Sequence, residues 1–403
     1  MTNLPQGWEV KTLSEIGEIV TGSTPSKSNL DFYGKDYPFF KPSDFEQGYF
    51  LENAGDNLSK LGFGKARQLP PKTILVVCIG SLGKVALTKV IGSCNQQINA
   101  IIPHKNIISE YIYYYCISSK FQSILFSKAP QTTLAILNKT EFSKLEIIYP
   151  KDIKEQERIV GILDFAFSKI DENIKKAKEN LANIDELMQS ALQKAFNPLN
   201  DNTKENYQLP QSWEWKSLGD TSNYGKTSQV KPSQLKGNDW ILELEDIEKE
   251  SGVLLQKVLF QDRQSKSNKI KFNKGDILFG TLRPYLKKVI IADDNGACSS
   301  EIMPFSTGNF ITNHFIYYYL FANFLHDRIS SLTYGARMPR LGTKDGKSLQ
   351  IPLPPLQEQE QIAEHLDFVF EKAKALKELY TKELKDYEEL KQSLLDKAFK
   401  GEL

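Results

Sequence analysis

The sequence predicts an α+β protein built from two tandem globular domains, each followed by a long helix, with the two helices pairing as an antiparallel coiled coil. Three observations predict this fold. The chain of 403 residues exceeds the usual size of one domain, it repeats itself with a period of about 204 residues, and each copy closes with a long segment of helical periodicity. Short strands between Gly, Pro, Asn and Asp turns, with one helix per copy, indicate α+β domains.

The repeat is defined by anchors at both ends of each copy. Leu4-Pro5-Gln6-Gly7-Trp8-Glu9 returns as Leu209-Pro210-Gln211-Ser212-Trp213-Glu214, Ile112-Tyr113-Tyr114-Tyr115 returns as Ile316-Tyr317-Tyr318-Tyr319, and Lys194-Ala195-Phe196 returns as Lys397-Ala398-Phe399. Between the anchors, residues 20–69 and 222–272 have little in common. A common frame with different inserts is typical of one scaffold that presents two different binding surfaces.

These anchors also set the expected boundaries. We expect a first domain at residues 1–150, a first helix at 151–200, a linker at 201–206, a second domain at 207–351 and a second helix at 352–403. Prolines precede both helices, and Asn197-Pro198 ends the first. Each helix would run to about 45 residues, or roughly 65 Å.

Both helical segments carry an apolar seam with heptad spacing. The first seam is Phe167, Ile170, Ile174, Ala177, Leu181, Ile184, Met188, Ala191 and Ala195, and the second is Phe370, Ala373, Lys377, Tyr380, Leu384, Tyr387, Lys391, Leu394 and Ala398. We expect Leu376, Leu379 and Leu390 to widen the second seam. A long helix with one apolar stripe needs a partner, and the other copy is present at high effective concentration. Packing on its own domain, or dimerisation, is the alternative.

Within the domains we expect strands at residues 74–79, 100–102, 241–244 and 289–292, and a helix around each tyrosine run. Tyrosines can stack on unpaired bases. Because the runs belong to the shared frame and not to the variable inserts, we interpret them as the core face of a helix.

Composition narrows the class of protein. Hydrophobic residues make up 40% and charged residues 25%, as in globular proteins, and the net charge is +1. Residues 1–150 carry 15 basic and 12 acidic side chains and residues 207–350 carry 19 and 15, so two mildly basic domains are joined by an acidic framework. No stretch approaches the roughly 20 apolar residues of a membrane span, and no signal peptide is evident, which predicts a cytoplasmic protein.

No catalytic motif is complete. Gly225-Lys226-Thr227 resembles the end of a phosphate-binding loop, but Asp220 stands where the first glycine belongs. The four cysteines and four histidines form no metal-binding pattern. The acidic run Glu243-Leu244-Glu245-Asp246 is a candidate for a divalent ion, although its alternation favours a strand edge. We therefore expect no catalytic residues, no metal and no cofactor in this chain.

Over its whole length the chain resembles the specificity subunits of type I restriction-modification systems. The likeness is carried by the L-P-x-x-W-x-x-x-x-L opening of each half (residues 4–13 and 209–218), by the Ile-Pro-Leu-Pro-Pro-Leu-x-Glu-Gln entry to the last helix (residues 351–359), and by the alternation of two domains with two helices. The first copy departs from the paired prolines, with Ile148-Tyr149-Pro150-Lys151-Asp152 in their place.

The resemblance implies a non-catalytic subunit with two target-recognition domains, which bind an asymmetric bipartite site on double-stranded DNA in the major grooves. The paired helices would set the unread gap between the half-sites. It also implies partners: two methyltransferase subunits that use S-adenosylmethionine, and restriction subunits that use ATP and magnesium. The Gln- and Glu-rich helix starts (residues 155–158 and 358–361) recur in both copies, so they are either scaffold or docking sites for the two methyltransferase subunits.

Base recognition needs donor and acceptor side chains on loops that enter a groove. In the first domain the candidates are Thr24, Ser26, Lys27, Lys41, Ser43, Asp44, Lys84, Gln96, Gln97, Asn99, Thr132 and Thr133. In the second domain they are Tyr224, Lys226, Thr227, Thr281, Arg283, Tyr285, Ser299, Ser300, Glu301, Tyr334, Arg337 and Arg340, with Arg337 and Arg340 foremost. For each of them an ordinary turn or capping role is the alternative.

Two other classes remain open. One is a structural adaptor whose coiled coil joins proteins and whose domains bind peptides or glycans. The other is a nuclease or methyltransferase active by itself, which the missing motifs disfavour; the nearest string to a methyltransferase motif is Asn197-Pro198-Leu199-Asn200.

Overall fold

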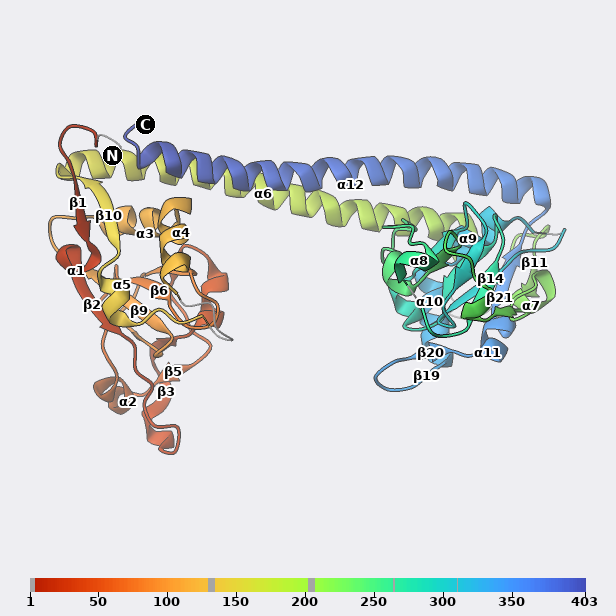
Figure 1. Ribbon diagram of the computed structural model, residues 1–403, viewed down its shortest axis with the longest axis horizontal. Helices are drawn as coiled ribbons and strands as arrows, with labels where there is room; N and C mark the ends of the chain where they lie inside the picture. Colours follow the sequence, from red (N-terminus) through yellow and green to blue (C-terminus); the bar gives the residue numbers. More distant parts are fainter. Residues whose placement is uncertain (1–3, 130–134, 202–206, 264, 310) are drawn as a thin grey trace. The chain divides into compact units, whose positions relative to one another are not determined.

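A computed structural model describes residues 4–129, 135–201, 207–263, 265–309 and 311–403. The chain forms two compact units, one comprising Met1–Ala177 with Lys382–Leu403 and the other comprising Lys178–Thr381. Each unit contains one α+β domain together with segments of both long helices (Figure 1). No helix in the described ranges is both long and apolar enough to cross a membrane.

Unit 1 holds the first domain. Its strands are β1 (Trp8–Thr12), β2 (Gly17–Thr21), β3 (Tyr33–Phe40), β4 (Phe50–Leu51), β5 (Asn57–Leu58), β6 (Ile74–Val77), β7 (Val85–Thr88), β8 (Ser93–Cys94), β9 (Ile98–Pro103) and β10 (Glu146–Pro150). Its short helices are α1 (Leu13–Ile16), η1 (Leu30–Phe32), η2 (Pro42–Gln47), α2 (Lys60–Lys65), α3 (Ser109–Ile117), α4 (Ser119–Lys128) and α5 (Lys139–Ser143). The main sheet has the order β2-β9-β6-β7-β4.

Unit 2 holds the second domain. Its strands are β11 (Glu214–Ser217), β12 (Ser228–Val230), β13 (Trp240–Leu242), β14 (Lys269–Phe272), β15 (Ile277–Gly280), β16 (Val289–Ile291), β17 (Gly296–Cys298), β18 (Ile302–Phe305), β19 (Thr333–Tyr334), β20 (Arg340–Leu341) and β21 (Gln350–Leu353). Its short helices are α7 (Leu218–Thr221), η3 (Pro232–Gln234), η4 (Leu244–Asp246), α8 (Phe260–Arg263), η5 (Pro284–Leu286), α9 (Asn313–Tyr319), α10 (Asn323–Leu332) and α11 (Thr343–Ser348).

The two domains share a frame of strands. The antiparallel order β9-β6-β7 in the first domain corresponds to β18-β15-β16 in the second. Each domain also has a parallel pair, β3 with β8 and β13 with β17, and an antiparallel pair of its first and last strands, β1 with β10 and β11 with β21. The repeat found in the sequence is therefore a repeat of structure, and the two domains differ mainly in the segments between these strands.

All four predicted strands exist, but those predicted at 74–79 and 241–244 both end two residues early, at Val77 and Leu242. The segments at 74–79, 100–102 and 289–292 overlap β6, β9 and β16. The segment at 241–244 was expected to continue along the acidic run, but β13 ends at Leu242 and the run folds into the 3-10 turn η4. The turn forms in place of a longer strand because the Asp246 carboxylate accepts a hydrogen bond from the Glu243 backbone N–H at 2.8 Å.

The tyrosine runs lie in helices α3 and α9 and face the core, as predicted. Tyr114 and Tyr115 are 2% and 1% exposed, and Tyr318 and Tyr319 are 4% and 3% exposed. This burial explains why the runs belong to the shared frame.

The long helices α6 (Ile153–Phe196) and α12 (Leu356–Ala398) pair antiparallel within both units. In unit 1, Lys391 Nζ lies 2.5 Å from Asp171 Oδ1, so the end of α12 lies against the first half of α6. In unit 2, Lys377 Nζ lies 2.5 Å from Asp185 Oδ1, so the middle of α12 lies against the second half of α6. The two lysines that interrupt the second seam therefore each find a carboxylate on the opposite helix.

The predicted seams are confirmed, since every seam position named above is buried or half-buried. The expected widening of the second seam is wrong: Leu376, Leu379 and Leu390 are 41%, 58% and 46% exposed. A pair of helices covers only a narrow stripe on each member, and these leucines lie on its flanks.

The end of each long helix completes the core of the domain from the other half of the chain. In unit 1 the ring of Phe399 packs edge-on against Tyr111 and Tyr115, with centroids 5.4 and 5.0 Å away. In unit 2 the ring of Phe196 packs in the same manner against Phe315 and Tyr319, at 5.1 Å from each. The recurring Lys-Ala-Phe motif thus marks the exchanged helix ends.

A buried glutamine anchors the start of each long helix. Gln156 is fully buried; its side-chain oxygen accepts from the Ile108 N–H at 2.9 Å and its amide donates to the Pro150 carbonyl at 2.9 Å. Gln359 is also fully buried and bonds in the same way to the Thr312 N–H at 3.0 Å and the Pro354 carbonyl at 2.8 Å. At these two positions the helix starts therefore act as scaffold.

We expect Gln156→Ala to lower the free energy of unfolding of the chain by about 1 to 3 kcal/mol, because buried backbone groups lose their partners. The measurement is urea denaturation followed by circular dichroism. Gln361→Ala, which truncates an exposed glutamine in the other helix start, is the matched control. Equal midpoints for the Gln156 variant, the control and the parent would contradict this anchoring role.

Candidate nucleic-acid interface

The second domain has a polar cavity beside the turn that follows strand β15. Its volume is about 550 Å³. The charged residues that line it are Glu243, Glu245, Glu301, Arg263, Arg283 and Lys288, and apolar walls come from Leu244, Leu282, Leu286 and Met338. Carboxylates and guanidinium groups together at one opening can accept and donate hydrogen bonds, which is what the recognition of base edges requires.

A second cavity of about 430 Å³ shares three of these residues, Leu282, Glu301 and Met338, and adds Tyr334, Gly335 and Arg340. The added residues come from the hairpin of β19 and β20, whose loop extends away from the rest of its unit (Figure 1). The Arg340 guanidinium donates to the Ser300 carbonyl at 3.4 Å. The two cavities form one continuous polar surface of the second domain.

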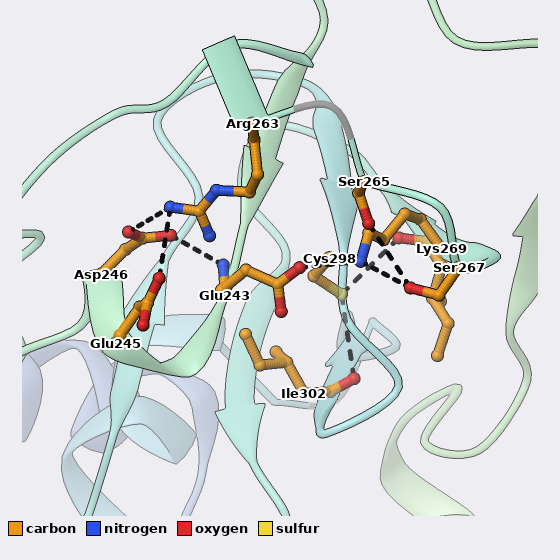
Figure 2. Close-up of polar contacts among 10 residues, drawn as sticks. Glu243, Glu245, Asp246, Arg263, Ser265, Ser267, Lys269, Cys298 and Ile302 are labelled. Carbon is orange, nitrogen blue, oxygen red and sulfur yellow. Dashed lines mark hydrogen bonds and ion pairs between the residues drawn. The ribbon is translucent and has the colours of Figure 1, made fainter. Parts of the chain in front are cut away.

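A network of buried charges holds one wall of the first cavity (Figure 2). Asp246 is fully buried, and its carboxylate accepts from Arg263 Nη2 at 2.7 Å and from Gln256 at 2.8 Å. Lys269, 2% exposed, donates to Glu243 at 2.7 Å. Each buried charge has a partner of opposite sign, which is the condition for burying charges at all. The network fixes the turn that carries Glu245, a residue whose side chain is 78% exposed.

One side-chain nitrogen of Arg263 takes no part in these contacts. Its Nη1 atom is buried and has no hydrogen-bond partner among the described residues. Buried donors without partners are rare in folded proteins, and a water molecule or a ligand group would satisfy this one.

The turn after β15 is built on residues with left-handed backbones. Arg283 has φ of 50° and Lys287 has φ of 46°, and between them lies the 3-10 turn η5. Lys287 is buried and its ammonium group donates to the Phe321 carbonyl at 3.1 Å and to Asn323. Burial lowers the pKa of Lys287 from its usual value. Arg283, in contrast, is exposed at the cavity.

Several residues predicted for the second domain are brought together at this surface. Arg283, Glu301, Tyr334 and Arg340 line the two cavities. Ser300, Tyr285 and Arg337 are exposed, and each is adjacent in sequence to a residue that lines the first cavity. Lys226 and Thr227 are exposed on the loop before β12 and line neither cavity.

Three other residues predicted for this domain are buried. Tyr224 is 1% exposed and packs edge-on against Phe305. Thr281 is 4% exposed and donates to the Glu301 carbonyl at 3.0 Å, and Ser299 is 7% exposed. Because all three are buried, we do not include them in the proposed interface.

In the first domain the candidates are spread over several turns. Ser26, Lys27, Ser43 and Gln96 are exposed, and Thr24 donates to Gln96. Lys41 pairs with Asp56, and Lys84 pairs with Glu46. Thr132 and Thr133 lie outside the described residues.

The remaining candidates of the first domain hold its loops together. Asp44 is 9% exposed and accepts from the backbone of Lys41 at 2.7 Å and of Gly55 at 3.0 Å. Asn99 is 2% exposed and accepts from the Thr21 hydroxyl at 2.7 Å. The half-buried Gln97 accepts from Asn95 at 2.8 Å. The contacts of Asp44 and Gln97 are the turn roles that the sequence left open, whereas Asn99 joins the paired strands β2 and β9.

Sequence reasoning missed four charged residues of the cavity: Glu243, Glu245, Arg263 and Lys288. The first two were considered only for a metal ion, and the described residues contain no group of three His, Cys, Asp or Glu side chains that could hold one. One signal was present in the sequence. In both domains an aspartate, Asp44 or Asp246, stands four residues after the last residue of a strand and closes the turn.

The chain matches a family model and several known proteins. The model of the type I restriction modification DNA specificity domain matches residues 5–183 and 210–385. The HindI specificity subunit of Haemophilus influenzae is 39% identical over 176 residues, which cover 42% of this chain and 38% of that protein. The MjaIX specificity subunit of Methanocaldococcus jannaschii is 29% identical over 54% of this chain and 52% of its own length. The match thus spans about half or less of these two relatives.

Other relatives match along nearly the whole chain. The EcoDI specificity subunit of Escherichia coli is 23% identical over 99% of this chain and 89% of its own length. Among solved structures, a chain from a study of complex assembly and conformational transition of the type I R-M system has a TM-score of 0.77 at 19% identity, with full coverage of both chains. The HsdS subunit from Thermoanaerobacter tengcongensis has a TM-score of 0.53 at 19% identity over 99% of this chain.

The two solved structures share the fold of this chain, and the family model covers both of its domains together with parts of both long helices. The protein therefore belongs to the family of type I restriction-modification DNA specificity subunits.

Proposed function

We propose that this chain recognises a bipartite DNA sequence for a type I restriction-modification complex, with one half-site bound by each domain. The observation that carries the proposal is the polar surface of the second domain, where Arg283, Glu301, Tyr334 and Arg340 converge on a shared strand frame. Different side chains on the same frame in the first domain would make the two half-sites different, and the recognised sequence asymmetric.

Recognition in the major groove suits these side chains. Arginine donates to guanine, and carboxylates accept from cytosine, while tyrosine and serine contact phosphates and bases less selectively. In this proposal the loop between β19 and β20, with Arg337 at its exposed tip, enters the groove.

The proposed function is tested by co-expressing the chain with the methyltransferase encoded beside it and mapping adenine methylation across a test genome. We expect a bipartite motif that appears only when this chain is present. Methylation that is the same without the chain would contradict the proposal and favour a structural adaptor.

We expect Arg337→Ala to weaken binding to the cognate site by about 1 to 3 kcal/mol, the range for one good base contact. Binding to DNA without the site should change little, because that binding depends on phosphates. Fluorescence anisotropy with both DNAs, using the assembled complex, measures the difference. Equal affinity and equal sequence choice in the variant and the parent would remove Arg337 from the interface.

We further propose that the paired helices set the gap between the half-sites. Each helix is more than forty residues long, 44 in α6 and 43 in α12, and a rigid pair holds two domains apart better than a flexible linker does. Two modules that bind major grooves on one side of DNA need a separation of about one helical turn, or a multiple of it.

A deletion of one heptad from each helix tests this spacer role. Removing residues 175–181 together with 381–387 shortens both helices by about 10 Å and lies between the two ion pairs, Lys391 with Asp171 and Lys377 with Asp185. We expect the gap in the methylated motif to change, because a loss of about 10 Å equals about three base pairs at 3.4 Å each and moves one domain away from its half-site in the parent motif. An unchanged gap in an active variant would contradict the spacer role.

Docking of two methyltransferase subunits is a further part of the proposal, and repeated exposed apolar residues support it. Phe165 on α6 is 69% exposed and Phe368 on α12 is 59% exposed, and both stand in a Leu-Asp-Phe sequence. About three turns before them, Ile153 and Leu356 are also exposed, at 39% and 44%. Because each helix start presents the same apolar pair, the two sites would bind two copies of one partner. Restriction subunits would then join the assembled methyltransferase.

We expect Phe165→Ser to reduce the number of methyltransferase subunits per chain from two to one, and the double variant with Phe368→Ser to abolish assembly. Native mass spectrometry of the purified complexes gives these numbers. Leu379→Ser is the control, because Leu379 is 58% exposed on α12 but its counterpart in the first copy is Lys176. Two bound subunits in the double variant would show that docking lies elsewhere.

A further inference from the structure

The turns that follow strands β6 and β15 occupy the same place in the two domains. The Cys78 N–H donates to the Gln97 carbonyl at 2.7 Å, and the Thr281 N–H donates to the Glu301 carbonyl at 2.8 Å. At the far end of the turns, the Val77 N–H bonds to Lys84 and the Gly280 N–H bonds to Lys288, both at 2.9 Å. Gln97 and Glu301 are therefore equivalent positions.

A third segment fixes the equivalence residue by residue. Ile79 pairs with Ile136 in the first domain, as Leu282 pairs with Arg340 in the second. The next residue in each turn donates its N–H to the same strand segment: Gly80 to the Ala135 carbonyl at 3.3 Å, and Arg283 to the Pro339 carbonyl at 2.7 Å. Arg283 thus stands where the first domain has Gly80.

Both residues have a left-handed backbone, but only one of them is a glycine. Gly80 has φ of 84° and Arg283 has φ of 50°. A side chain is disfavoured in this region, and such strain is found mainly where the residue has a function. Within the described part of the chain, the structure records no hydrogen bond or ion pair for the Arg283 guanidinium. The fold itself gains no polar contact that would account for an arginine at this position.

Position 283 is also next to position 301. A Cβ atom built on Gly80 would lie 3.6 Å from the Gln97 side-chain nitrogen, which places the two equivalent side chains side by side in the first domain. In the second domain, Arg283 and Glu301 line the same cavity. The Glu301 carboxylate is half-buried and, like the guanidinium, has no recorded partner among the described residues. The pair offers a donor and an acceptor to a ligand at one opening.

A G·C base pair matches this arrangement. In the major groove, guanine presents two acceptors that suit an arginine, and the paired cytosine presents an amino donor that suits a carboxylate. We propose that Arg283 and Glu301 together read one G·C pair in the half-site of the second domain, an inference that rests on the proposed function. The first domain, with Gly80 and Gln97 at these positions, lacks this contact.

The test is methylation mapping of the co-expressed complex with Arg283→Gly and, separately, Glu301→Gln. Each variant takes the residue that the first domain has at the equivalent position, and Arg283→Gly relieves the left-handed backbone. We expect each to lower discrimination by about 5- to 150-fold at one and the same G·C pair, the range for one bidentate contact. The other half-site should keep its sequence, and the thermal unfolding midpoint of Arg283→Gly should be no lower than that of the parent.

Lys274→Ala is the matched control, since it removes one exposed charge before β15, at the end of that strand opposite to Arg283. It should leave the motif unchanged. If both test variants keep the motif of the parent, the inference is overturned. The proposed function is still supported in that case, because the parent methylates a bipartite motif. Equal loss of methylation at all sites in Arg283→Gly would show a phosphate contact and also overturn it. The absence of any motif in the parent would instead reject the proposed function.

Discussion

The structure depends on the exchange of helix ends between the two halves of the chain. Phe399 lies in the core of unit 1, and Phe196 lies in the core of unit 2. Each ring packs against two aromatic rings of a helix in the domain it enters, and its removal would leave a cavity in that core. Neither half of the sequence therefore contains all of the core that its own domain needs.

This constraint determines the direction and the pairing of the long helices. A helix that must reach the other domain has to start in a fixed direction, and the buried glutamines provide this by bonding to strands and loops of the first domain at Gln156 and of the second at Gln359. The lysines in the α12 seam then meet aspartates of α6, which favours one register of the pair. With core and helices fixed, the turns between the strands are free to differ.

The sequence predicted the parts of the structure that follow from periodicity. The seams, the strands and the burial of the tyrosine runs could be predicted because apolar spacing reports directly on which face is buried. The exposed Leu379 could not be placed, since spacing alone does not say how wide the contact between two helices is. The turn at Glu243 was missed because a local hydrogen bond from the Glu243 N–H to the Asp246 carboxylate outweighed an alternating pattern.

The candidate site was predictable in its chemistry but not in its geometry. Arg283 and Glu301 were named because donor and acceptor side chains on loops suit base edges. Their adjacency depends on the pairing of strands about twenty residues apart in the sequence. The left-handed backbone of Arg283 could not be predicted, because glycine is the residue expected in that conformation. Tyr224 has an equally suitable side chain, yet it is buried against Phe305, which only the fold reveals.

The exchange of helix ends also has a consequence for synthesis of the protein. The ribosome delivers the first domain more than two hundred residues before it delivers Phe399, so Tyr111 and Tyr115 emerge without the ring that covers them. Domains usually fold as units while the chain is being made, and exposed apolar surface during that interval invites aggregation. For this protein, completion of the first domain is among the last events of folding, and chaperones have an apolar surface to bind until then.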